Sequence, residues 1–192
     1  MKALILNGSR KGETHIETPH SIATKLLEES NYEVTSFLLH ELDIKNCIGC
    51  YGCWLKTPGI CTIDDLGRDI AKSIIQSDLV VYLTPIVFGG VSSELKKVVD
   101  RIIPLVLPFF TRVNGEVHHK PRYDKYPRVI VLGVLPQKNE AMEIPFKKLI
   151  ERNALNWFNP QYSGTVLHSC CETVEIENKI ETLIKDRGVK VC

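Results

Sequence analysis

Asp78-Leu-Val-Val-Tyr-Leu-Thr84 is a continuous apolar run rich in β-branched residues, and Pro85 closes it. A run of this kind, without alternating polar residues, is typical of a strand buried on both faces of a sheet. Shorter runs of the same character are spread along the chain, and helical patterns separate them. The five predicted strands are residues 2–6, 32–39, 78–84, 128–135 and 162–167.

Between these strands, apolar residues recur with the spacing of an amphipathic helix. We expect Thr18 and either Ser92 or Ser93 as N-caps, and Pro145 either lies in the first turn of its helix or breaks it. Strands alternating with helices predict an α/β fold, a flavodoxin-like doubly wound five-stranded parallel sheet in the order 2-1-3-4-5 with helices on both faces. The predicted helices are residues 21–29, a helix starting at Asp64 or Asp65, and residues 92–103, 141–157 and 174–185.

The chain has 192 residues, and we expect residues 1–192 to form one domain, with a Cys-rich loop at 41–63 and an excursion at 111–127. Its 24 Lys and Arg nearly balance 23 Asp and Glu, which argues against a protein that coats nucleic acid or an anionic membrane. The longest apolar-rich run, Ile102–Phe110, contains two prolines and is too short to span a bilayer. No signal peptide is recognised, so a cytoplasmic protein is expected.

A polar loop follows the first predicted strand. Backbone amides at a helix N-terminus, hydroxyls and a guanidinium group together can form a phosphate site. The loop has neither the spacing of a Walker A loop nor the G-x-G-x-x-G pattern, and an ordinary polar turn is the alternative. The residues concerned are Ser9, Arg10 and Lys11 between Gly8 and Gly12, followed by Thr14, Thr18 and Ser21.

An apolar loop follows the third predicted strand. Pro85-Ile86-Val87-Phe88-Gly89-Gly90 places an aromatic side chain before two glycines. Such a segment can lie flat against a planar ring, with backbone amides facing the polar edge of that ring. Strands 1 and 3 meet at the switch point of the predicted sheet, so both loops are expected at one ligand site. A plain loop with one exposed phenylalanine is the alternative.

Four of the seven cysteines, Cys47, Cys50, Cys53 and Cys61, lie in the loop after the second predicted strand. In a reducing compartment, clustered cysteines are typical of metal ligands or redox thiols. Structural zinc sites pair two Cys-x2-Cys units that lie further apart, whereas the run of three evenly spaced cysteines is nearer to that of ferredoxins, which hold an iron–sulfur cluster. A bound cluster, an ordered thiol loop and a zinc site are the three alternatives.

Three segments, Leu4–Arg10, Thr84–Gly90 and Ser93–Arg101, together resemble the flavodoxin-like NAD(P)H-dependent FMN reductase family. The resemblance covers roughly the first two thirds of the chain. It implies an FMN whose phosphate is held near Ser9 and Arg10 and whose ring lies along Pro85 to Gly89. About five extra residues follow the loop compared with the common family pattern. Thr14, Thr18 and Ser21 are therefore alternative hydroxyls for the phosphate.

The cysteine loop is similar to that of the iron–sulfur flavoproteins, a branch of the same family that carries FMN and a [4Fe-4S] cluster. Another branch has a similar loop that serves as a lid over the flavin without any cluster. The resemblance also implies a homodimer or a higher homo-oligomer, because FMN sites in this family are often completed at subunit contacts.

We therefore expect an FMN-dependent NAD(P)H oxidoreductase of the flavin reductase type, passing electrons to a small molecule or a redox protein. The flavin performs the hydride chemistry, so no catalytic side chain is predicted. An electron-transfer carrier with FMN and a [4Fe-4S] cluster is the alternative, and a flavin-free redox sensor is a third hypothesis. We interpret the basic stretch His118–Tyr123 as a solvated excursion or a dimer contact, with contact to nicotinamide phosphates or an acidic redox partner as the alternative.

Overall fold

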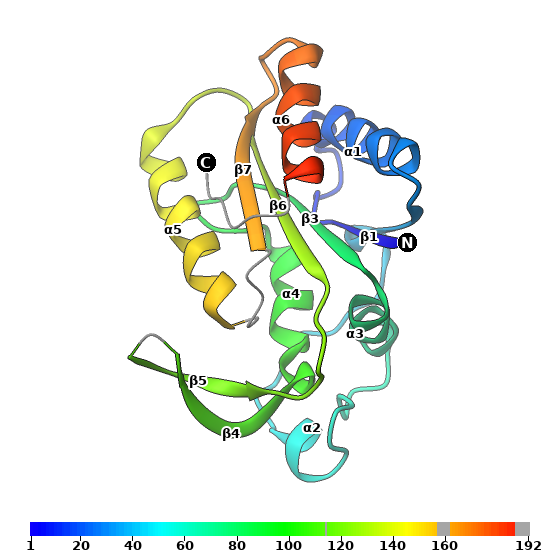
Figure 1. Ribbon diagram of the computed structural model, residues 1–192, viewed down its shortest axis with the longest axis vertical. Coiled ribbons are helices and arrows are strands. Elements are labelled where there is room, and N and C mark those ends of the chain that lie inside the picture. The colour runs from blue at the N-terminus through cyan, green and yellow to red at the C-terminus, as the bar shows by residue number, and fades with distance from the viewer. Residues whose placement is uncertain (114, 157–161, 187–192) are drawn as a thin grey trace.

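A computed structural model describes residues 1–113, 115–156 and 162–186. Its central feature is a five-stranded sheet in the order β2-β1-β3-β6-β7, in which all neighbouring strands are parallel (Figure 1). The predicted flavodoxin-like sheet is confirmed, and β6 and β7 are its fourth and fifth strands. The strands are β1 Lys2–Asn7, β2 Glu33–Leu38, β3 Leu79–Pro85, β6 Arg128–Leu135 and β7 Tyr162–His168.

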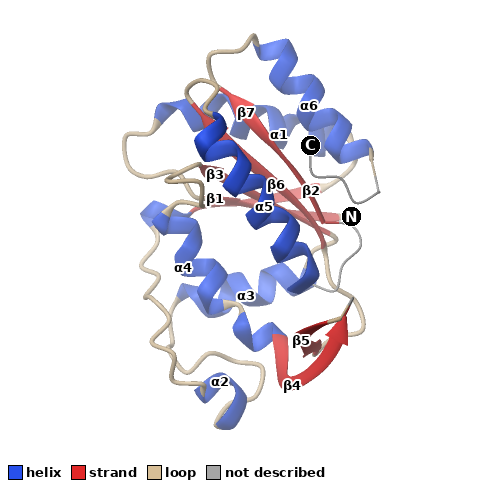
Figure 2. Cartoon of the chain, turned by 90° about the vertical axis from the view of Figure 1, so that its left-hand side faces the viewer, coloured by secondary structure: helices blue, strands red, loops and turns tan. Residues whose placement is uncertain are grey.

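Helices cover both faces of the sheet (Figures 1 and 2). Because side chains alternate along a strand, β1 directs Leu4 and Leu6 into one hydrophobic core and Ala3 and Ile5 into the other. The first core lies beneath α3, α4 and α5, and the second beneath α1 and α6. The helices are α1 Glu17–Glu29, α3 Leu66–Gln76, α4 Ser93–Arg101, α5 Glu140–Asn156 and α6 Thr173–Lys185.

Two of the expected helix starts are confirmed. The Asp65 carboxylate accepts a hydrogen bond from the Gly67 N–H at 2.9 Å, and the Ser92 hydroxyl oxygen accepts one from the Leu95 N–H at 3.2 Å. The N-cap expected at Thr18 is wrong. A 3-10 turn, η1 (Thr14–Ile16), runs directly into α1, so the helix begins at Glu17 and Thr18 lies inside its first turn.

Pro145 lies inside α5, beyond its first turn, and the helix continues through it. The sequence expectation of a first-turn position or a break is therefore wrong at this residue. A proline removes one backbone donor, and so one hydrogen bond, from the interior of a helix. At this position the proline ring contacts the loop after β3. A Cβ atom added to Gly89 would lie 2.5 Å from Pro145 Cγ.

The excursion is an antiparallel hairpin formed by β4 (Val106–Val113) and β5 (Glu116–Pro121). It starts at Val106, five residues earlier than the sequence suggested, because α4 ends at Arg101 and a 3-10 turn, η3 (Ile103–Leu105), leads into the first strand. Two short elements were not predicted: η2 (Leu39–Glu41) precedes the cysteine loop and α2 (Gly52–Leu55) lies within it. Both are too short to show a helical repeat of apolar residues in the sequence. Among the described residues, no helix has the length and apolar character needed to cross a bilayer.

Gly133, in the middle of β6, allows α5 to pack closely on the sheet. A Cβ atom at this position would lie 2.3 Å from Cε1 of the fully buried Phe146 and 2.9 Å from Ile86 Cδ1. We expect Gly133→Ala to lower the free energy of unfolding by about 1–3 kcal/mol, because one extra methyl overpacks the core. Urea denaturation measures the change.

The compensating control is Phe146→Leu in the Gly133→Ala background, which removes ring atoms from the same space and should recover part of the loss. A Gly133→Ala protein as stable as the wild type would contradict this description of the core.

Candidate functional site

The loops after β1 and β3 are joined to each other at the carboxyl edge of the sheet, the edge at which the parallel strands end. The Gly8 N–H donates to the Leu83 carbonyl oxygen at 2.7 Å, and the Ser92 hydroxyl donates to the Gly8 carbonyl oxygen. The Ser92 N–H in turn donates to Thr84 Oγ1 at 2.9 Å. One buried serine therefore fixes both loops relative to the start of α4.

Gly8 is required by this close approach. A Cβ atom on Gly8 would lie 2.8 Å from Leu95 Cβ and 2.8 Å from Ser92 Oγ. The backbone of the β1 loop therefore touches the first turn of α4 directly. The next residue, Ser9, is buried, and its N–H donates to Asn7 Oδ1 at 2.9 Å, which turns the chain away from the sheet.

Arg10 lies at the mouth of this loop and is paired with Glu13. Its backbone N–H donates to Glu13 Oε2 at 2.8 Å and its Nε donates to Glu13 Oε1 at 2.9 Å. Burial disfavours the charge of Glu13, but the hydrogen bonds from Arg10 outweigh burial and lower the pKa of Glu13 below its ordinary value. Sequence reasoning missed Glu13, although its spacing of three residues from Arg10 is that of a local ion pair.

The remaining residues of the expected phosphate site are spread along the chain. Lys11 and Thr14 are exposed close to the loop, and Thr14 begins the helical stretch. Thr18 and Ser21 are exposed further along, inside α1. Because the backbone donors of the first helical turn lack partners within the helix, Thr14 at the start of η1 and Thr18 in the first turn of α1 lie closer to such donors than Ser21 does.

The loop after β3 is a tight turn that presents Phe88 to solvent. Val87 and Gly90 exchange two backbone hydrogen bonds of 3.0 and 2.9 Å, and the two residues between them have φ angles of 49° at Phe88 and 73° at Gly89. A left-handed conformation costs a residue other than glycine about 1–2 kcal/mol. Phe88 is nevertheless 95% exposed, so packing within the described part of the chain does not offset this cost. Strain of this kind is concentrated at functional sites.

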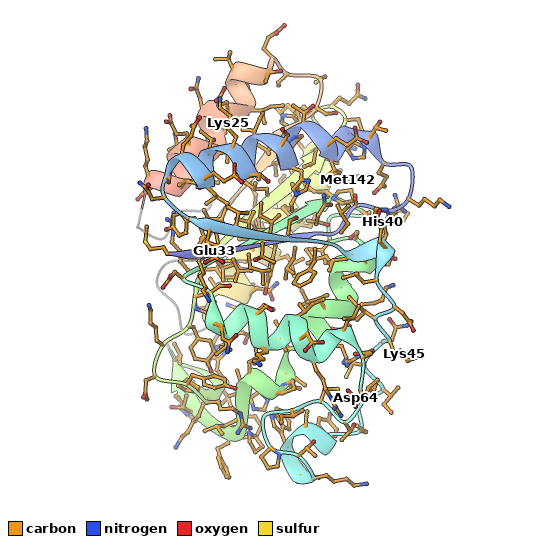
Figure 3. All side chains as sticks on the ribbon, turned by 90° about the vertical axis from the view of Figure 1, so that its right-hand side faces the viewer. Lys25, Glu33, His40, Lys45, Asp64 and Met142 are labelled. Carbon is orange, nitrogen blue, oxygen red and sulfur yellow. The ribbon has the colours of Figure 1, made fainter. Side chains whose placement is uncertain are left out.

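The base of the same loop is rigid. Pro85 and Ile86 are buried, and the Ile86 N–H donates to the Val134 carbonyl oxygen of β6 at 2.9 Å. In Figure 3, Glu33 marks the start of β2 and His40 lies in η2, directly after β2, and Met142 of α5 lies toward the same end of the sheet as His40. The carboxyl edge is thus bordered by β2 on one side and by the start of α5 on the other.

The four cysteines of the loop 47–61 line one small cavity of about 30 Å³, together with Arg101. The Cys53 side chain is buried and Cys47 and Cys50 are exposed, while Cys61 is half-buried. In the residues that the structure describes, no three His, Cys, Asp or Glu side chains lie close enough together to hold a metal ion. The thiols therefore share a cavity without forming a closed ligand set.

The thiols differ in acidity. A hydrogen-bonding contact between Cys50 Sγ and Thr62 Oγ1 at 3.4 Å, helped by the Gly52 backbone, lowers the pKa of Cys50. Burial raises the pKa of Cys53, and the neighbouring thiol of Cys61 raises it further. The exposed Cys50 is consequently the more readily ionised of the two.

Two arginines hold the ends of the cysteine loop. The buried Arg101, on α4, donates to Asp65 through two hydrogen bonds of 2.9 and 2.7 Å and to the carbonyl oxygen of Lys45 at 2.7 Å. Arg68 donates to the carbonyl oxygen of Cys61 at 2.7 Å. Figure 3 shows the two ends of the loop, marked by Lys45 and Asp64, on the same side of the molecule. Arg101 therefore joins both ends.

Sequence reasoning did not identify Arg101, although a signal was present. Leu95, Val98 and Arg101 follow one another at three-residue intervals and are all buried. A charged residue on the apolar stripe of a helix requires a buried partner, and Asp65 supplies it.

The hairpin contacts the cysteine loop through aromatic rings. Trp54 of α2 lies 4.8 Å from His119 between ring centroids, and its Nε1 donates to the Val106 carbonyl oxygen at 2.9 Å. The neighbouring His118 is buried, with its Nδ1 3.0 Å from Asn156 Oδ1 of α5. The interpretation of this stretch as a solvated excursion is therefore wrong for His118 and His119, which pack against other elements.

Comparison with known proteins identifies the family of this chain. Residues 1–123, more than half of the chain, match the family described as NADPH-dependent FMN reductase. The chain belongs to this family. The resemblance that the sequence motifs carried is therefore confirmed.

Among curated proteins, an iron–sulfur flavoprotein of Methanocaldococcus jannaschii is 33% identical over 119 residues, which is 61% of this chain and 61% of that protein. An iron–sulfur flavoprotein of Archaeoglobus fulgidus is 29% identical over 104 residues, or 54% of this chain and 46% of that protein. The match thus spans only about half to three fifths of the length of these relatives.

Among solved structures, an NAD(P)H:quinone oxidoreductase from Methanothermobacter marburgensis aligns with a TM-score of 0.68 at 12% identity, covering 97% of this chain and 98% of that one. An FMN-dependent NADH-azoreductase from Bacillus anthracis, in complex with FMN, aligns with a TM-score of 0.61 at 13% identity, covering 95% of each chain. At such identities the likeness concerns the fold alone.

The pair formed by Asp65 and Arg101 gives the cysteine loop a measurable dependence on pH. Burial opposes ionisation of Asp65, but hydrogen bonds from Arg101 and from the Lys45 N–H outweigh it and lower its pKa from 3.8 to about 2. The stabilisation is present above about pH 4 and is lost as the pH falls toward 2, a contribution of about 2 kcal/mol. We expect Asp65→Asn to remove this part of the acid dependence and to destabilise the protein by about 3–5 kcal/mol, because it leaves Arg101 buried without a counter-charge.

Asp64→Asn is the matched control, because the adjacent Asp64 side chain is 84% exposed and pairs only with Arg68 among the described residues. Urea unfolding of both variants between pH 2 and pH 7 measures the difference. Equal stability of the two variants at neutral pH would refute the structural role of the Asp65 pair.

Proposed function

We propose that this chain is an FMN-dependent NAD(P)H oxidoreductase of the flavin reductase type, which takes hydride from a nicotinamide and supplies electrons to a small molecule or a redox protein. The observation that carries the proposal is the Ser92 hydrogen-bond network, which holds the polar β1 loop and the apolar β3 loop together at the carboxyl edge. Ligands of open parallel sheets bind at this position. A phosphate and a planar ring are joined in one molecule in FMN, and the two loops offer one surface for each.

The β1 loop fits the phosphate. Gly8 packs directly on Leu95 and Ser92 of α4, which fixes where the loop leaves the sheet and where the next residues, from Ser9 on, begin. Ser9, Arg10, Lys11 and Thr14 would hold the phosphate, and Arg10 would turn from Glu13 toward it. A charge-assisted hydrogen bond from a guanidinium to a phosphate is stronger than one between neutral groups. Thr18 and Ser21 lie further along α1 and contribute the next hydroxyls on that side.

The β3 loop fits the ring. Pro85 and Ile86 form its rigid base, and Val87, Phe88 and Gly89 form the turn against which the ring would lie. The exposed, strained Phe88 provides apolar area that burial against a flat aromatic surface would stabilise. Bound FMN supplies the hydride-accepting chemistry, while this chain orients the ring and excludes water from one of its faces.

The reaction is tested with the flavin-loaded protein under anaerobic conditions. We expect FMN to co-purify, and NADPH or NADH to bleach the yellow absorbance of the protein. We expect Arg10→Ala to weaken FMN binding by about 10- to 100-fold, the value of one charged hydrogen bond, and Glu13→Gln to strengthen it, because it frees the guanidinium. Fluorescence titration of the apoprotein with FMN measures both effects.

The matched control is Glu17→Gln, an exposed acidic residue of the first turn of α1 that has no contact with Arg10. A protein that binds no FMN, or whose flavin neither nicotinamide reduces, would contradict the proposed function. A weakened affinity in Glu13→Gln would contradict the role given to Arg10.

A second candidate function is electron transfer through FMN and a [4Fe-4S] cluster. The favouring observation is that Cys47, Cys50, Cys53 and Cys61 all line one cavity, and the curated relatives described above are iron–sulfur flavoproteins. Four thiols on one loop are the donor set that such a cluster needs. The cavity of about 30 Å³ holds little more than one water molecule, so the exposed cysteines would move outward to admit the cluster.

Anaerobic purification with iron and acid-labile sulfide assays tests this candidate. A cluster predicts about four irons per chain, and we expect Cys53→Ser to lose them. The matched control is Cys170→Ser, since Cys170 is a free, exposed cysteine outside the loop. An iron-free wild-type protein would exclude the carrier and favour an ordered thiol loop at the flavin site, and bound zinc would favour a zinc site.

We also propose a homodimer or higher homo-oligomer. The support is the set of exposed apolar side chains on two loops of the described chain, Phe88 on the β3 loop and Ile48, Tyr51 and Leu55 on the cysteine loop. Large exposed apolar patches on a folded protein mark interaction sites. Sedimentation equilibrium measures the oligomeric state, and a monomer at all concentrations would contradict this proposal. The expected cytoplasmic location and the single domain over residues 1–192 stay predictions.

A further inference from the structure

The start of α5 is tied to the end of β7 through one carboxylate. Glu143 is buried in the first turn of α5, and its Oε1 lies 2.9 Å from Nε2 of His168, the last residue of β7. The same oxygen accepts a hydrogen bond from the Asn139 N–H at 3.1 Å, just before the helix. In Figure 1, the loop from β6 into α5 and the end of β7 both lie at the upper end of the sheet.

The two bonds keep Glu143 charged. Burial opposes its ionisation, but the hydrogen bonds from His168 and from the Asn139 N–H outweigh burial and lower the pKa of Glu143 below its ordinary value. A charged carboxylate is tolerated in a buried position only where it is paired and hydrogen-bonded. Loss of these partners would therefore favour movement of the carboxylate, and of the helix start that carries it, toward water.

The segment that carries His168 is fixed to the sheet. The Ser169 N–H donates to the Leu135 carbonyl oxygen at 2.9 Å, and the Cys170 N–H donates to the Pro136 carbonyl oxygen at 3.1 Å. These bonds join the turn after β7 to the end of β6. The His168 side chain is itself only 15% exposed, so it offers Glu143 a rigid support.

The other side of the α5 start supports the loop after β3. The position of a Cβ atom on Gly89 lies 2.5 Å from Pro145 Cγ and 3.4 Å from the Met142 carbonyl oxygen. The first two turns of α5 therefore lie directly against the backbone of Gly89. Because the neighbouring Phe88 is almost fully exposed, its side chain does not anchor the turn, and the contact with α5 determines where the turn lies.

We propose that Glu143 and His168 are positioning residues for the flavin site: they hold the start of α5 on β7, and α5 in turn holds the turn of the β3 loop on which the flavin ring would lie. Neither residue touches the flavin, and both act through the contact between Pro145 and Gly89. The proposal rests on the proposed function only in its last step, the placement of the ring on this turn.

This role accounts for the proline in the interior of α5. Pro145 removes a backbone hydrogen bond from the helix, and its ring is the part of α5 that lies closest to the position of a Gly89 Cβ atom. A closed ring has fewer conformations than a flexible side chain of similar size. It therefore transmits a displacement of the helix start to the turn directly.

The first measurement needs no flavin. In the isotope-labelled full chain, we expect Glu143→Ala and His168→Ala to shift the backbone amide resonances of Phe88 and Gly89. Glu143→Gln should shift them much less, because the carboxamide oxygen can still accept both hydrogen bonds.

The matched control is Glu151→Ala, which removes an exposed carboxylate of the same helix that pairs with Lys148. It should leave the resonances of Phe88 and Gly89 in place. If Glu143→Ala does not fold, His168→Ala decides, because it leaves Glu143 its bond from the Asn139 N–H.

The second measurement compares FMN with riboflavin, which lacks the phosphate. We expect Glu143→Ala to weaken binding of both by the same factor, about five- to tenfold, the value of one hydrogen bond, because the ring and not the phosphate is displaced. In a Pro145→Ala background the same substitution should change binding by less than about twofold, because the contact with Gly89 is already reduced. General destabilisation of the chain would act equally in both backgrounds.

Unshifted Phe88 and Gly89 resonances in Glu143→Ala and His168→Ala would overturn the proposal, whether or not the protein binds flavin. Shifted resonances with unchanged affinity for both flavins would overturn its last step, and an equal effect of Glu143→Ala with and without Pro145 would overturn the route through the proline. A wild-type protein that binds no flavin would instead contradict the proposed function, and the amide resonances would still decide whether the pair positions the turn.

Discussion

The hydroxyl of Ser92 is the interaction on which the carboxyl edge of this protein depends. It donates to the backbone of the β1 loop and accepts from the first turn of α4, while the N–H of the same residue reaches Thr84 at the end of β3. The β1 loop, the end of β3 and the first turn of α4 are thus joined through one buried residue. Because its two bonds are buried, losing the hydroxyl would leave the Gly8 carbonyl and the Leu95 N–H without this partner at the same time.

The sequence predicted the sheet well because its signals are local. A parallel strand buried on both faces is a continuous apolar run, and Leu79–Pro85 and Arg128–Leu135 are such runs. Helix starts were predicted where a side chain caps the backbone, as at Asp65 and Ser92. The start at Glu17 was missed because a 3-10 turn, and not a polar side chain, precedes it.

The loops of the site were predictable from the sequence, but the side-chain pairs that hold them were not. Ser9 and the segment 85–89 follow strands 1 and 3, and topology alone brings their strand ends together. The pairing of Arg10 with Glu13, and of Arg101 with Asp65, depends on side-chain geometry that no periodicity encodes. The start of the hairpin was predicted too far along the chain, because the apolar residues of the 3-10 turn Ile103–Leu105 look like a continuation of the preceding helix in the sequence.

The contact between Trp54 and His119 has a practical consequence. The indole ring is stacked on Tyr51, tilted against the imidazole of the hairpin, and bonded through its nitrogen to the first residue of β4. Tryptophan emission depends on the polarity and hydrogen bonding around the indole. Detachment of the hairpin would expose this ring to water and leave the sheet intact. In a variant whose other tryptophan, Trp157, is replaced, the emission of Trp54 therefore reports whether the cysteine loop and the hairpin are joined, without any added label.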